Sequence, residues 1–553
     1  MLSRREFLAS GTAAAALAAA PSDALAQSPR THQTLPDAVP PTSPNPVSTR
    51  PSDNLGGSTI KVGHNPGDLQ RAINASAQGD TLVVPAGVAY SPITLPIRTG
   101  NGWTCIRTAS DSLPAAGTRV SASNANAMFK VHSGGERGSA RAVMIPAGTQ
   151  GWRFIGMEAT HPNDNFQYGL IDGNGSRTSF ERCYIHGRPT QVLRRCIFVI
   201  GNDFQLWDSW LSEAKEPGSD SQAIFFRNNA RAHVENCELQ GAGENIMLGD
   251  QGSDTASTDV TLKRNHFFKP LTWRKLLSTG RANPSWDGVL WVIKELFEIK
   301  WAKRVLLEGN VLENNWGLQG QEGVASLFTS GIPEEAFWQS KRLDTSDVMV
   351  RSNIYKNTPY VFAVGKNRVD APSVERTAYL NNLALDVGGR FIFLNHAASD
   401  VWIEHNTCAP QAAHNSDLWA GLNAQGAMMI DVLGPGAMPR MTLKRNLFGW
   451  GSLPGASNGG IWFLVNGGGV GALTNAILDT YMRDRSWAEN ARYDRDPSAP
   501  LLNGMTYYAS AAAAGIDTKT GRLNAGSPLI RAGSDGKDIG VDFVTLDSAQ
   551  TGT

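Results

Sequence analysis

One short pattern recurs along this 553-residue chain: apolar, any, apolar, two polar residues, Asn, any, apolar. The clear copies are residues 260–267, 305–312, 348–355, 401–408 and 441–448, and the weaker copies are residues 152–159, 178–185, 204–211, 232–239 and 377–384. Each copy alternates apolar and polar residues, which indicates a strand with one buried face. A single strand cannot bury that face, but stacked copies can, and stacking also pairs their backbones.

The spacing of the copies predicts a solenoid. The Asn-equivalent positions run from Met157 to Asn446 and are 24 to 45 residues apart, with a basic period in the middle to high twenties. Asn suits the turn because it tolerates left-handed backbone, and from Asn265 onward its side chains are expected to stack as a ladder. We predict an all-β fold, a single-stranded right-handed parallel β-helix of roughly ten or more coils with long loop insertions.

Both ends of the repeat fit this fold. Residues 66–73 are expected to form an N-terminal capping helix, which would cover the strand edges of the first coil. A strand and turn follow over residues 79–87. This opening, and the ending from Ser527 to Gly540, resemble those of the pectate-lyase-like β-helix superfamily, over residues 59–545. The resemblance implies the fold but not the reaction, because the superfamily includes lyases, hydrolases, epimerases and binding proteins.

A second resemblance is more local. Residues 243–329 resemble a segment that recurs in uncharacterised bacterial β-helix-repeat proteins, in which a Gly-Glu-Asn turn precedes an RRNHFFKPLSW stretch. The matching parts here are residues 243–245, 263–274, 294–300 and 305–316. The chain departs from that pattern at Glu295, where Asn is common. This resemblance carries no activity with it.

The N-terminal residues predict export. Arg4 and Arg5 precede an Ala-rich apolar run, as in a bacterial twin-arginine signal peptide, which we place at residues 1–26. An ordinary secretory signal is the alternative, and the run is too short to span a membrane. Residues 27–58 are expected to be a disordered linker, residues 59–545 the β-helix and residues 546–553 a tail. We expect a periplasmic or secreted monomer.

Charge is balanced overall but uneven locally. The chain has 50 basic and 50 acidic residues, yet residues 235–259 hold six acidic residues and neither Lys nor Arg. Residues 263–304 hold ten basic residues against three acidic ones, and six of the fifteen tryptophans lie between Trp273 and Trp338. Aromatic rings beside cations suit an anionic polysaccharide. Nucleic acid is not expected, because an acidic segment adjoins the basic one.

Function is expected on the loops that interrupt the repeat, since a β-helix with minimal turns is mainly scaffold. The three excursions cover roughly residues 268–300, 316–345 and 410–438, and the first two are expected to wall one groove. Crowded positive charge lowers the pKa of a lysine, so Lys269 and Lys294 are the predicted catalytic bases. Arg274 is predicted to neutralise a substrate carboxylate or to act as an acid. The predicted substrate contacts are Trp273, His266, Glu298 and Trp316.

Calcium is the one cofactor considered, because no motif for an organic cofactor is evident. Glu244, Asp250 and Asp254 offer the hard oxygen ligands that Ca²⁺ prefers. Residues 249–254 also suit an ordinary solvent-exposed loop, so both interpretations stay open.

The reaction favoured by these residues is β-elimination by a polysaccharide lyase acting on a uronic-acid polymer. Three alternatives remain: a glycoside hydrolase, a uronate epimerase, and a non-catalytic glycan-binding surface protein. A hydrolase needs paired carboxylates, which the repeats do not make evident. The repeated Lys-Arg pairs at 263–264 and 444–445 are expected to be solvated turn residues.

Overall fold

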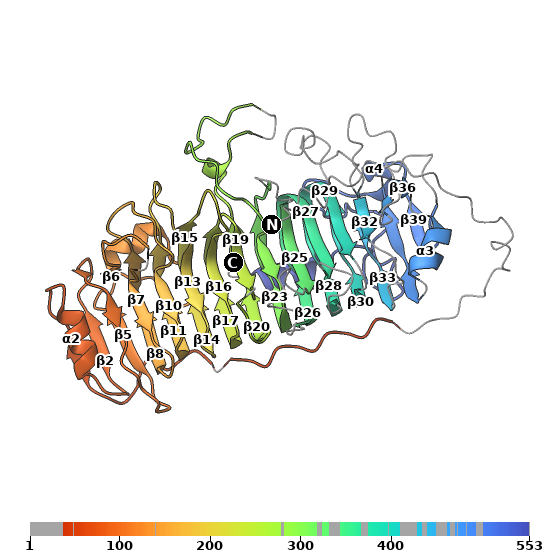
Figure 1. Ribbon diagram of the computed structural model, residues 1–553. Coiled ribbons are helices and arrows are strands. Elements are labelled where there is room, and N and C mark those ends of the chain that lie inside the picture. Colours follow the sequence, from red (N-terminus) through yellow and green to blue (C-terminus); the bar gives the residue numbers. More distant parts are fainter. Residues whose placement is uncertain are drawn as a thin grey trace.

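The chain forms an elongated parallel β-helix in which each coil contributes strands to three faces (Figure 1), so the predicted all-β solenoid is confirmed. This computed structural model describes residues 37–47, 49–138, 140–250, 252–277, 281–317, 323–330, 343–366, 374–395, 398–409, 428–433, 440–449, 462–464, 470–472, 474–482, 484–493 and 501–551.

The first face is a 14-stranded parallel sheet. Its strands, in order, are β1 (Thr59–Lys61), β2 (Thr81–Val84), β5 (Thr104–Thr108), β8 (Gln150–Ile155), β11 (Ser176–Glu181), β14 (Phe204–Trp207), β17 (Ala230–Glu235), β20 (Ser257–Lys263), β23 (Ala302–Glu308), β26 (Thr345–Arg351), β28 (Val374–Leu380), β30 (Ser399–Glu404), β33 (Met441–Lys444) and β37 (Arg485–Ala488).

The second and third faces together form a 23-stranded sheet. The second face contains β3 (Ala89–Tyr90), β6 (Phe129–His132), β9 (Met157–Thr160), β12 (Tyr184–His186), β15 (Trp210–Ala214), β18 (Glu238–Gly241), β21 (His266–Phe268), β24 (Val311–Glu313), β31 (Thr407–Ala409), β34 (Leu447–Phe448), β38 (Asn490–Arg492) and β39 (Met505–Tyr507). The third face contains β4 (Ile93–Thr94), β7 (Val143–Ile145), β10 (Ile171–Gly173), β13 (Arg195–Val199), β16 (Gln222–Phe226), β19 (Glu244–Leu248), β22 (Phe297–Ile299), β25 (Val324–Ser330) and β32 (Met428–Leu433). Two long strands, β27 (Ile354–Lys366) and β29 (Leu383–Asn395), pair with strands of both faces.

Few other elements are present in the described part of the chain. They are α2 (Asp68–Ala75), α3 (Asn475–Tyr481), α4 (Ala511–Ala514), α5 (Phe543–Gln550), the 3₁₀ turns η2 (Ala122–Ala127) and η3 (Leu271–Trp273), and an antiparallel pair, β35 (Trp462–Leu464) with β36 (Val470–Ala472).

The core follows directly from the repeat. Val260, Val305 and Val348 occupy equivalent positions on β20, β23 and β26, and each is fully buried. The leucines two residues further on in β20 and β23 stack in the same way. Identical inward positions therefore meet from coil to coil, and the apolar side chains form one continuous core along the solenoid.

The predicted Asn ladder is confirmed. The Oδ1 atom of Asn310 accepts hydrogen bonds from the backbone N and the Nδ2 of Asn265, at 2.8 and 3.1 Å. The same contacts link Asn310 to Asn353, and the ladder continues through Asn446 to Asn490. Asn490 lies outside any recognised copy of the pattern, so the sequence did not predict that the ladder includes this residue.

The ladder Asn is not the left-handed residue of the turn, which corrects the prediction. The positive φ falls one position earlier, at Arg264 (50°), Ser352 (53°) and Arg445 (52°), for example. The Asn side chain instead points inward and holds neighbouring coils together. Asn recurs along the ladder because its side chain forms hydrogen bonds between coils, and not because the backbone there is strained.

Part of the predicted linker is ordered. Residues 37–47 and 49–53, here named the strap, run along the first face in the direction opposite to the stacking of the coils (Figure 1). Backbone N–H groups of Val39, Thr42 and Asn45 donate to the carboxylates of Asp400, Asp347 and Asp259 at 2.8 to 3.0 Å. These regularly spaced acceptors fix the strap, so this stretch is not the disordered linker expected.

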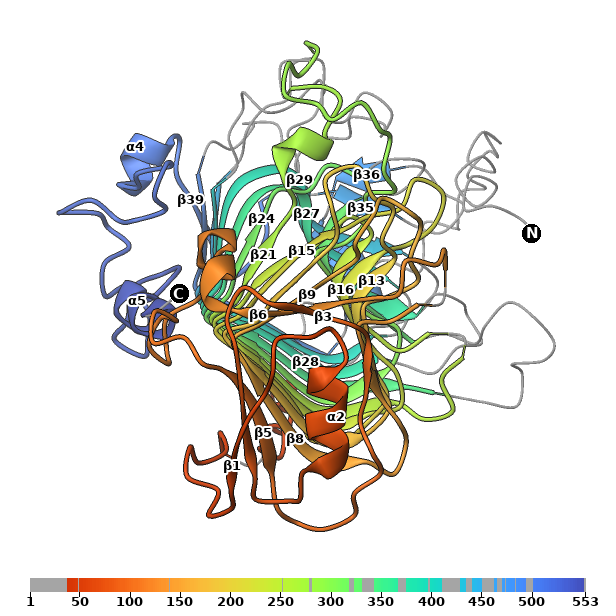
Figure 2. The same cartoon turned by 90° about the vertical axis from the view of Figure 1, so that its left-hand side faces the viewer.

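Helices cover the first coils and one side of the solenoid. Figure 2 shows α2 across the first coils, where Leu69 and Ile73 are fully buried. At the other end of the sequence, α5 packs along the turns between the first and second faces, with Leu546 buried and Gln550 Nε2 donating to Ser352 O at 3.0 Å. The predicted boundary at residue 545 therefore falls inside a helix. No helix among the described residues is long and apolar enough to cross a bilayer.

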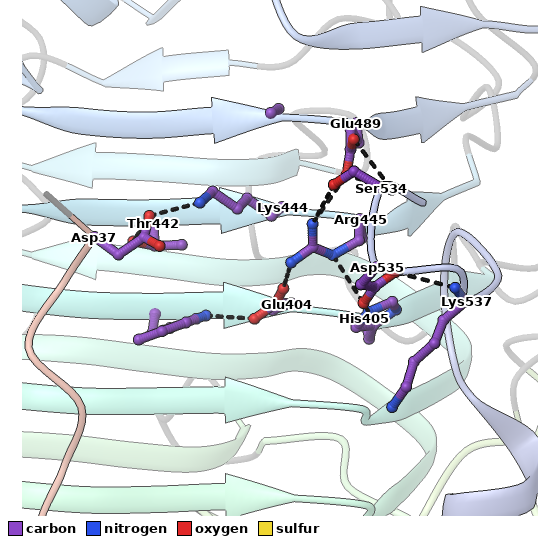
Figure 3. Close-up of polar contacts among 12 residues, drawn as sticks. Asp37, Glu404, His405, Thr442, Lys444, Arg445, Glu489, Ser534, Asp535 and Lys537 are labelled. Carbon is purple, nitrogen blue, oxygen red and sulfur yellow. Dashed lines mark hydrogen bonds and ion pairs between the residues drawn. The ribbon is translucent and has the colours of Figure 1, made fainter. Parts of the chain in front are cut away.

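An ion network docks the C-terminal segment before α5 (Figure 3). Asp535 accepts a hydrogen bond from His405 Nε2 at 2.8 Å, and Arg445 lies 3.3 Å from the same carboxylate. Arg445 also pairs with Glu404 and Glu489 on the two neighbouring coils, so one guanidinium joins three coils to the returning segment.

Candidate functional site

The first predicted excursion is the loop of residues 269–296, which leaves the second face after β21 and returns at β22. It projects well beyond the coils in Figure 1. The second excursion is not one loop, because β25 lies within it, and its residues 318–322 and 331–342 lie outside the described residues. Most of the third also lies outside them. One wall of the groove expected between the first two excursions therefore lies largely outside the described residues.

Lys269 anchors the start of the excursion. It is fully buried, and its Nζ donates to the carbonyl oxygens of Gly241, Ala242 and Gly243 at 2.7, 2.9 and 3.0 Å. Burial lowers the pKa of Lys269 to about 7. Hydrogen bonds to the three carbonyl oxygens oppose this lowering of the pKa, because only the ammonium form has three N–H donors. Lys269 thus holds the turn that precedes Glu244, and it is not placed to reach a substrate.

Two tryptophans of the excursion and one beyond it face inward, whereas Trp286 is half-buried. Trp273, Trp291 and Trp316 form a buried cluster, with Trp273 only 1% and Trp316 only 5% exposed. The ammonium of Lys215 lies 5.4 and 4.7 Å from the ring centroids of Trp273 and Trp291, and 3.4 Å from Asp287. These contacts fasten the excursion to the solenoid. The sugar-stacking role predicted for Trp273 and Trp316 is not supported, because neither ring offers a free face.

A cluster of buried ions lies where the excursion returns to the third face. Lys294 Nζ lies 2.5 Å from Glu244 Oε1, 2.9 Å from Asp220 and 3.4 Å from Glu298. Lys294, Glu244 and Glu298 are 5%, 0% and 0% exposed. We name this set the ion cluster; it consists of Asp220, Glu244, Lys294, Glu295, Glu298 and Lys300. The side chain of Asp220 is 42% exposed and connects the cluster to solvent.

Burial and charge perturb protonation in the ion cluster. Burial would lower the pKa of Lys294, but the surrounding carboxylates, Glu244 first, raise it well above its usual value. Burial raises the pKa of Glu244 to about 8, although Lys294 opposes this shift. Gln222 Nε2 donates to the second carboxylate oxygen of Glu244 at 2.7 Å. A buried carboxyl group with a pKa near neutrality is thus in direct contact with an ammonium group that keeps its proton.

The predicted calcium ligands do not converge. Oxygens of Glu244, Glu295 and Glu298 lie within 4.8 Å of one another, whereas Asp250 and Asp254 do not join Glu244 in any such group of described residues. Asp250 instead pairs with Arg227, at 2.8 Å between Oδ1 and Nε.

Calcium does not fit the three glutamates as they stand. The ammonium of Lys294 already lies 2.5 to 3.6 Å from their carboxylates, and Ca²⁺ would need the same position. The other acidic group, Glu404, His405 and Asp535, likewise surrounds the guanidinium of Arg445 (Figure 3). In both groups a side chain supplies the cation.

Two further predicted residues are Arg274, in the excursion, and His266, on the second face. Arg274 is 6% exposed, lies 5.9 Å from the Trp316 ring centroid and makes no ion pair with any described residue. Burial lowers its pKa to about 10. His266 lies on the second face, where its ring nitrogens contact Glu238 at 2.8 Å and Glu313 at 3.3 Å. His266 is therefore separated from the ion cluster, whereas Lys294, Glu244 and Glu298 are brought together.

Sequence reasoning missed Asp220, Gln222, Glu295 and Lys300 as members of this site. Period-two alternation on β22 was available as a signal, because it places Glu298 and Lys300 on the same side of the strand. Asp220 and Gln222 gave no signal, since only the stacking of coils brings them beside Glu244.

Comparison with known proteins assigns this chain to no family. No protein-family model matches the chain, and no curated protein matches its sequence. Similar solved structures include a family 6 polysaccharide lyase from Pseudopedobacter saltans (12% identity, 88% of this chain and 99% of that chain, TM-score 0.43). Another is a polygalacturonase from Erwinia carotovora (11% identity, 78% of this chain and 98% of that chain, TM-score 0.40). A third is a surface adhesin from Streptococcus pneumoniae (10% identity, 75% of this chain and 94% of that chain, TM-score 0.40).

Proposed function

We propose that this chain is a carbohydrate-active enzyme, a polysaccharide lyase that cleaves a uronic-acid polymer by β-elimination. The observation that carries the proposal is the ion cluster, in which Glu244, with a pKa of about 8, touches Lys294 at 2.5 Å. A buried carboxyl group whose pKa is shifted toward neutrality, in contact with an ammonium group, is typical of a proton-transfer site. The cluster lies at the foot of the longest described excursion, where a loop meets a rigid sheet.

Each step of the elimination has a candidate residue. Arg274, which has no carboxylate partner among the described residues, would pair with the uronate carboxylate and so acidify the C5 proton. Glu244, whose raised pKa makes its carboxylate a stronger base than an ordinary glutamate, would accept the C5 proton. The ammonium of Lys294 would protonate the departing O4, so Lys294 acts as the acid and not as the predicted base. The proton on Glu244 would then pass to Lys294 and restore both groups. Lys269 is not retained as a base, because its N–H groups are bound to backbone carbonyls.

The test is direct. Purified protein is incubated with polygalacturonate, alginate and glucuronan, and the absorbance of the unsaturated product is followed. We expect product from at least one of them, and we expect Lys294→Met to reduce the rate by about a hundredfold or more. Lys303→Met is the matched control, since Lys303 forms a half-exposed pair with Asp344 on the first face. No unsaturated product from any substrate would overturn the lyase assignment.

A glycoside hydrolase is the second candidate. The observation in its favour is the pair Glu244 and Glu298, which lie on neighbouring third-face strands with carboxylate oxygens within 4.8 Å. Retaining hydrolases use two carboxylates at roughly 5 Å separation. Against it, both side chains are fully buried and share the ammonium of Lys294. New reducing ends without unsaturation would favour the hydrolase.

The setting proposed for this activity is outside the cytoplasm. Residues 1–26, which carry the twin-arginine pattern, lie outside the described residues. We propose export to the periplasm or beyond, where a monomer would meet an anionic polysaccharide. Binding without any product would instead indicate a non-catalytic glycan-binding protein.

A further inference from the structure

Arg195 is a partly buried cation without a counter-ion. It begins β13 on the third face, and its Nε donates to Gln222 Oε1 at 2.9 Å. Among the described residues its side chain has no other hydrogen bond and no ion pair. The residue is half-buried, so part of its side chain reaches solvent.

Two phenylalanines hold this guanidinium in place. Phe198 and Phe225 stack at 5.2 Å with an interplanar angle of 12°, and Arg195 lies 4.5 Å from the Phe225 centroid and 5.7 Å from that of Phe198. The Phe198 and Phe225 side chains are supplied by adjacent coils, so the pair is a rigid platform. A guanidinium stacked on such a platform is oriented before any ligand arrives.

The neighbouring arginines are neutralised and Arg195 is not. Arg227 lies over the same two rings but pairs with Asp250, and Arg194 pairs with Glu216 at 2.7 Å. Burial, and then the charge of Arg194, lower the pKa of Arg195 to about 10. The side chain therefore remains charged at neutral pH, and the carboxylates of Asp250 and Glu244 act on it only from beyond ion-pair distance.

Arg195 is also joined to the ion cluster. Gln222, on the next coil, accepts from Arg195 and donates to Glu244 on the coil after that. At about 4.8 Å per coil, Arg195 lies roughly 10 Å from Glu244 along the solenoid. A chain extended along the third face would place two different sugar units at these two positions.

We propose that Arg195 binds an anionic group, a carboxylate or a sulfate ester, on another sugar unit of the same chain that reacts at the ion cluster. The two free Nη atoms present the fork that accepts such a group bidentately. Binding would compensate a charge that the fold leaves unpaired. The proposal deepens the proposed function and rests on it for the identity of the polymer.

The experiment measures binding by itself, without turnover. Calorimetric titration of the full chain uses size-matched oligomers of polygalacturonate and alginate as carboxylates, chondroitin sulfate as a sulfate ester, and a neutral dextran. We expect Arg195→Gln to weaken binding of the preferred anionic oligomer about tenfold or more, with no effect on dextran. Arg195→Lys should recover part of the loss, because it restores the charge but not the fork.

Arg231→Gln is the matched control. It removes the same charge from the first face, where Arg231 pairs with Asp203 at 2.5 Å, and it should leave binding unchanged. A melting temperature equal to wild type shows that Arg195→Gln is folded; if it is not, the comparison is made with Arg195→Lys. Wild-type affinity for anionic oligomers in the folded variant, or no anionic binding by wild type, would overturn the proposal. Arg195-dependent binding without unsaturated product would refute the lyase assignment alone.

Discussion

At the scale of single residues, the environment separates side chains that look equivalent in the sequence. Lys269 and Lys294 both lie in the basic segment, yet one donates to three carbonyls and the other is surrounded by carboxylates. The first arrangement is structural. The second couples a lysine to an acid of unusually high pKa, which is the property a proton-transfer site needs.

Replacing Lys269 should therefore affect stability before chemistry. Lys269→Met leaves the buried carbonyls of Gly241, Ala242 and Gly243 without their donor, and we expect a loss of about 3 kcal/mol or more in the free energy of unfolding. Urea denaturation measures this loss, with Lys303→Met as the control. A variant of full stability that has lost only activity would contradict the structural role.

His266 should make stability depend on pH. Burial alone would lower its pKa, but hydrogen bonds to Glu238 and Glu313 raise it to about 9, above the usual value of 6.5. A raised pKa gives stability that is complete below about pH 6.5 and is lost as the pH rises through 9. His266→Gln should thus cost on the order of 1–2 kcal/mol at pH 6 and little at pH 10. Unfolding curves across this range check it; a difference independent of pH would refute it.

At the scale of elements, contacts between distant segments complete the solenoid. The strap crosses the first face and binds Asp259, Asp347 and Asp400, which are also the partners of Arg304, Arg376 and Arg440 on the following coils. Each aspartate therefore joins two coils and the strap. The strap links coils that are not neighbours in the stack, whereas stacking alone links only adjacent coils.

Deleting residues 37–50 should weaken the coils that the strap crosses. We expect a lower melting temperature and faster amide hydrogen exchange in β20, β26 and β30, because Asp259, Asp347 and Asp400 lose backbone donors there. A synthetic peptide of residues 37–50 added in excess should restore part of the protection. Unchanged exchange in these strands would show that the strap contributes nothing.

At the scale of the whole molecule, side-chain cations occupy the acidic groups of the solenoid. Lys294 and Arg445 fill the two acidic groups of the described residues that could otherwise hold a metal. A side-chain cation fixes the local charge without any exchangeable ion. The fold of this chain should therefore not depend on calcium.

Removal of metal tests that expectation. Treatment with EDTA should leave the melting temperature of the purified protein unchanged, and added CaCl₂ should not raise it, because ammonium and guanidinium groups occupy the acidic groups. Differential scanning calorimetry gives the measurement. A fall of several degrees with EDTA that CaCl₂ reverses would show a metal site and restore the calcium prediction.

The amino-acid sequence determined the solenoid, because a repeated apolar alternation with Asn at a fixed position permits only stacked coils to bury Val260, Val305 and Val348 together. It also located the segment that forms the ion cluster, through its charge. Tertiary structure decided which of its residues meet. Asp220, Gln222 and Arg195 join Glu244 only because coils separated by 22 to 27 residues lie in register, and neither the strap nor the burial of Trp273 has a local signal. Side-chain environment is a property of packing, so the sequence pattern alone could not assign it.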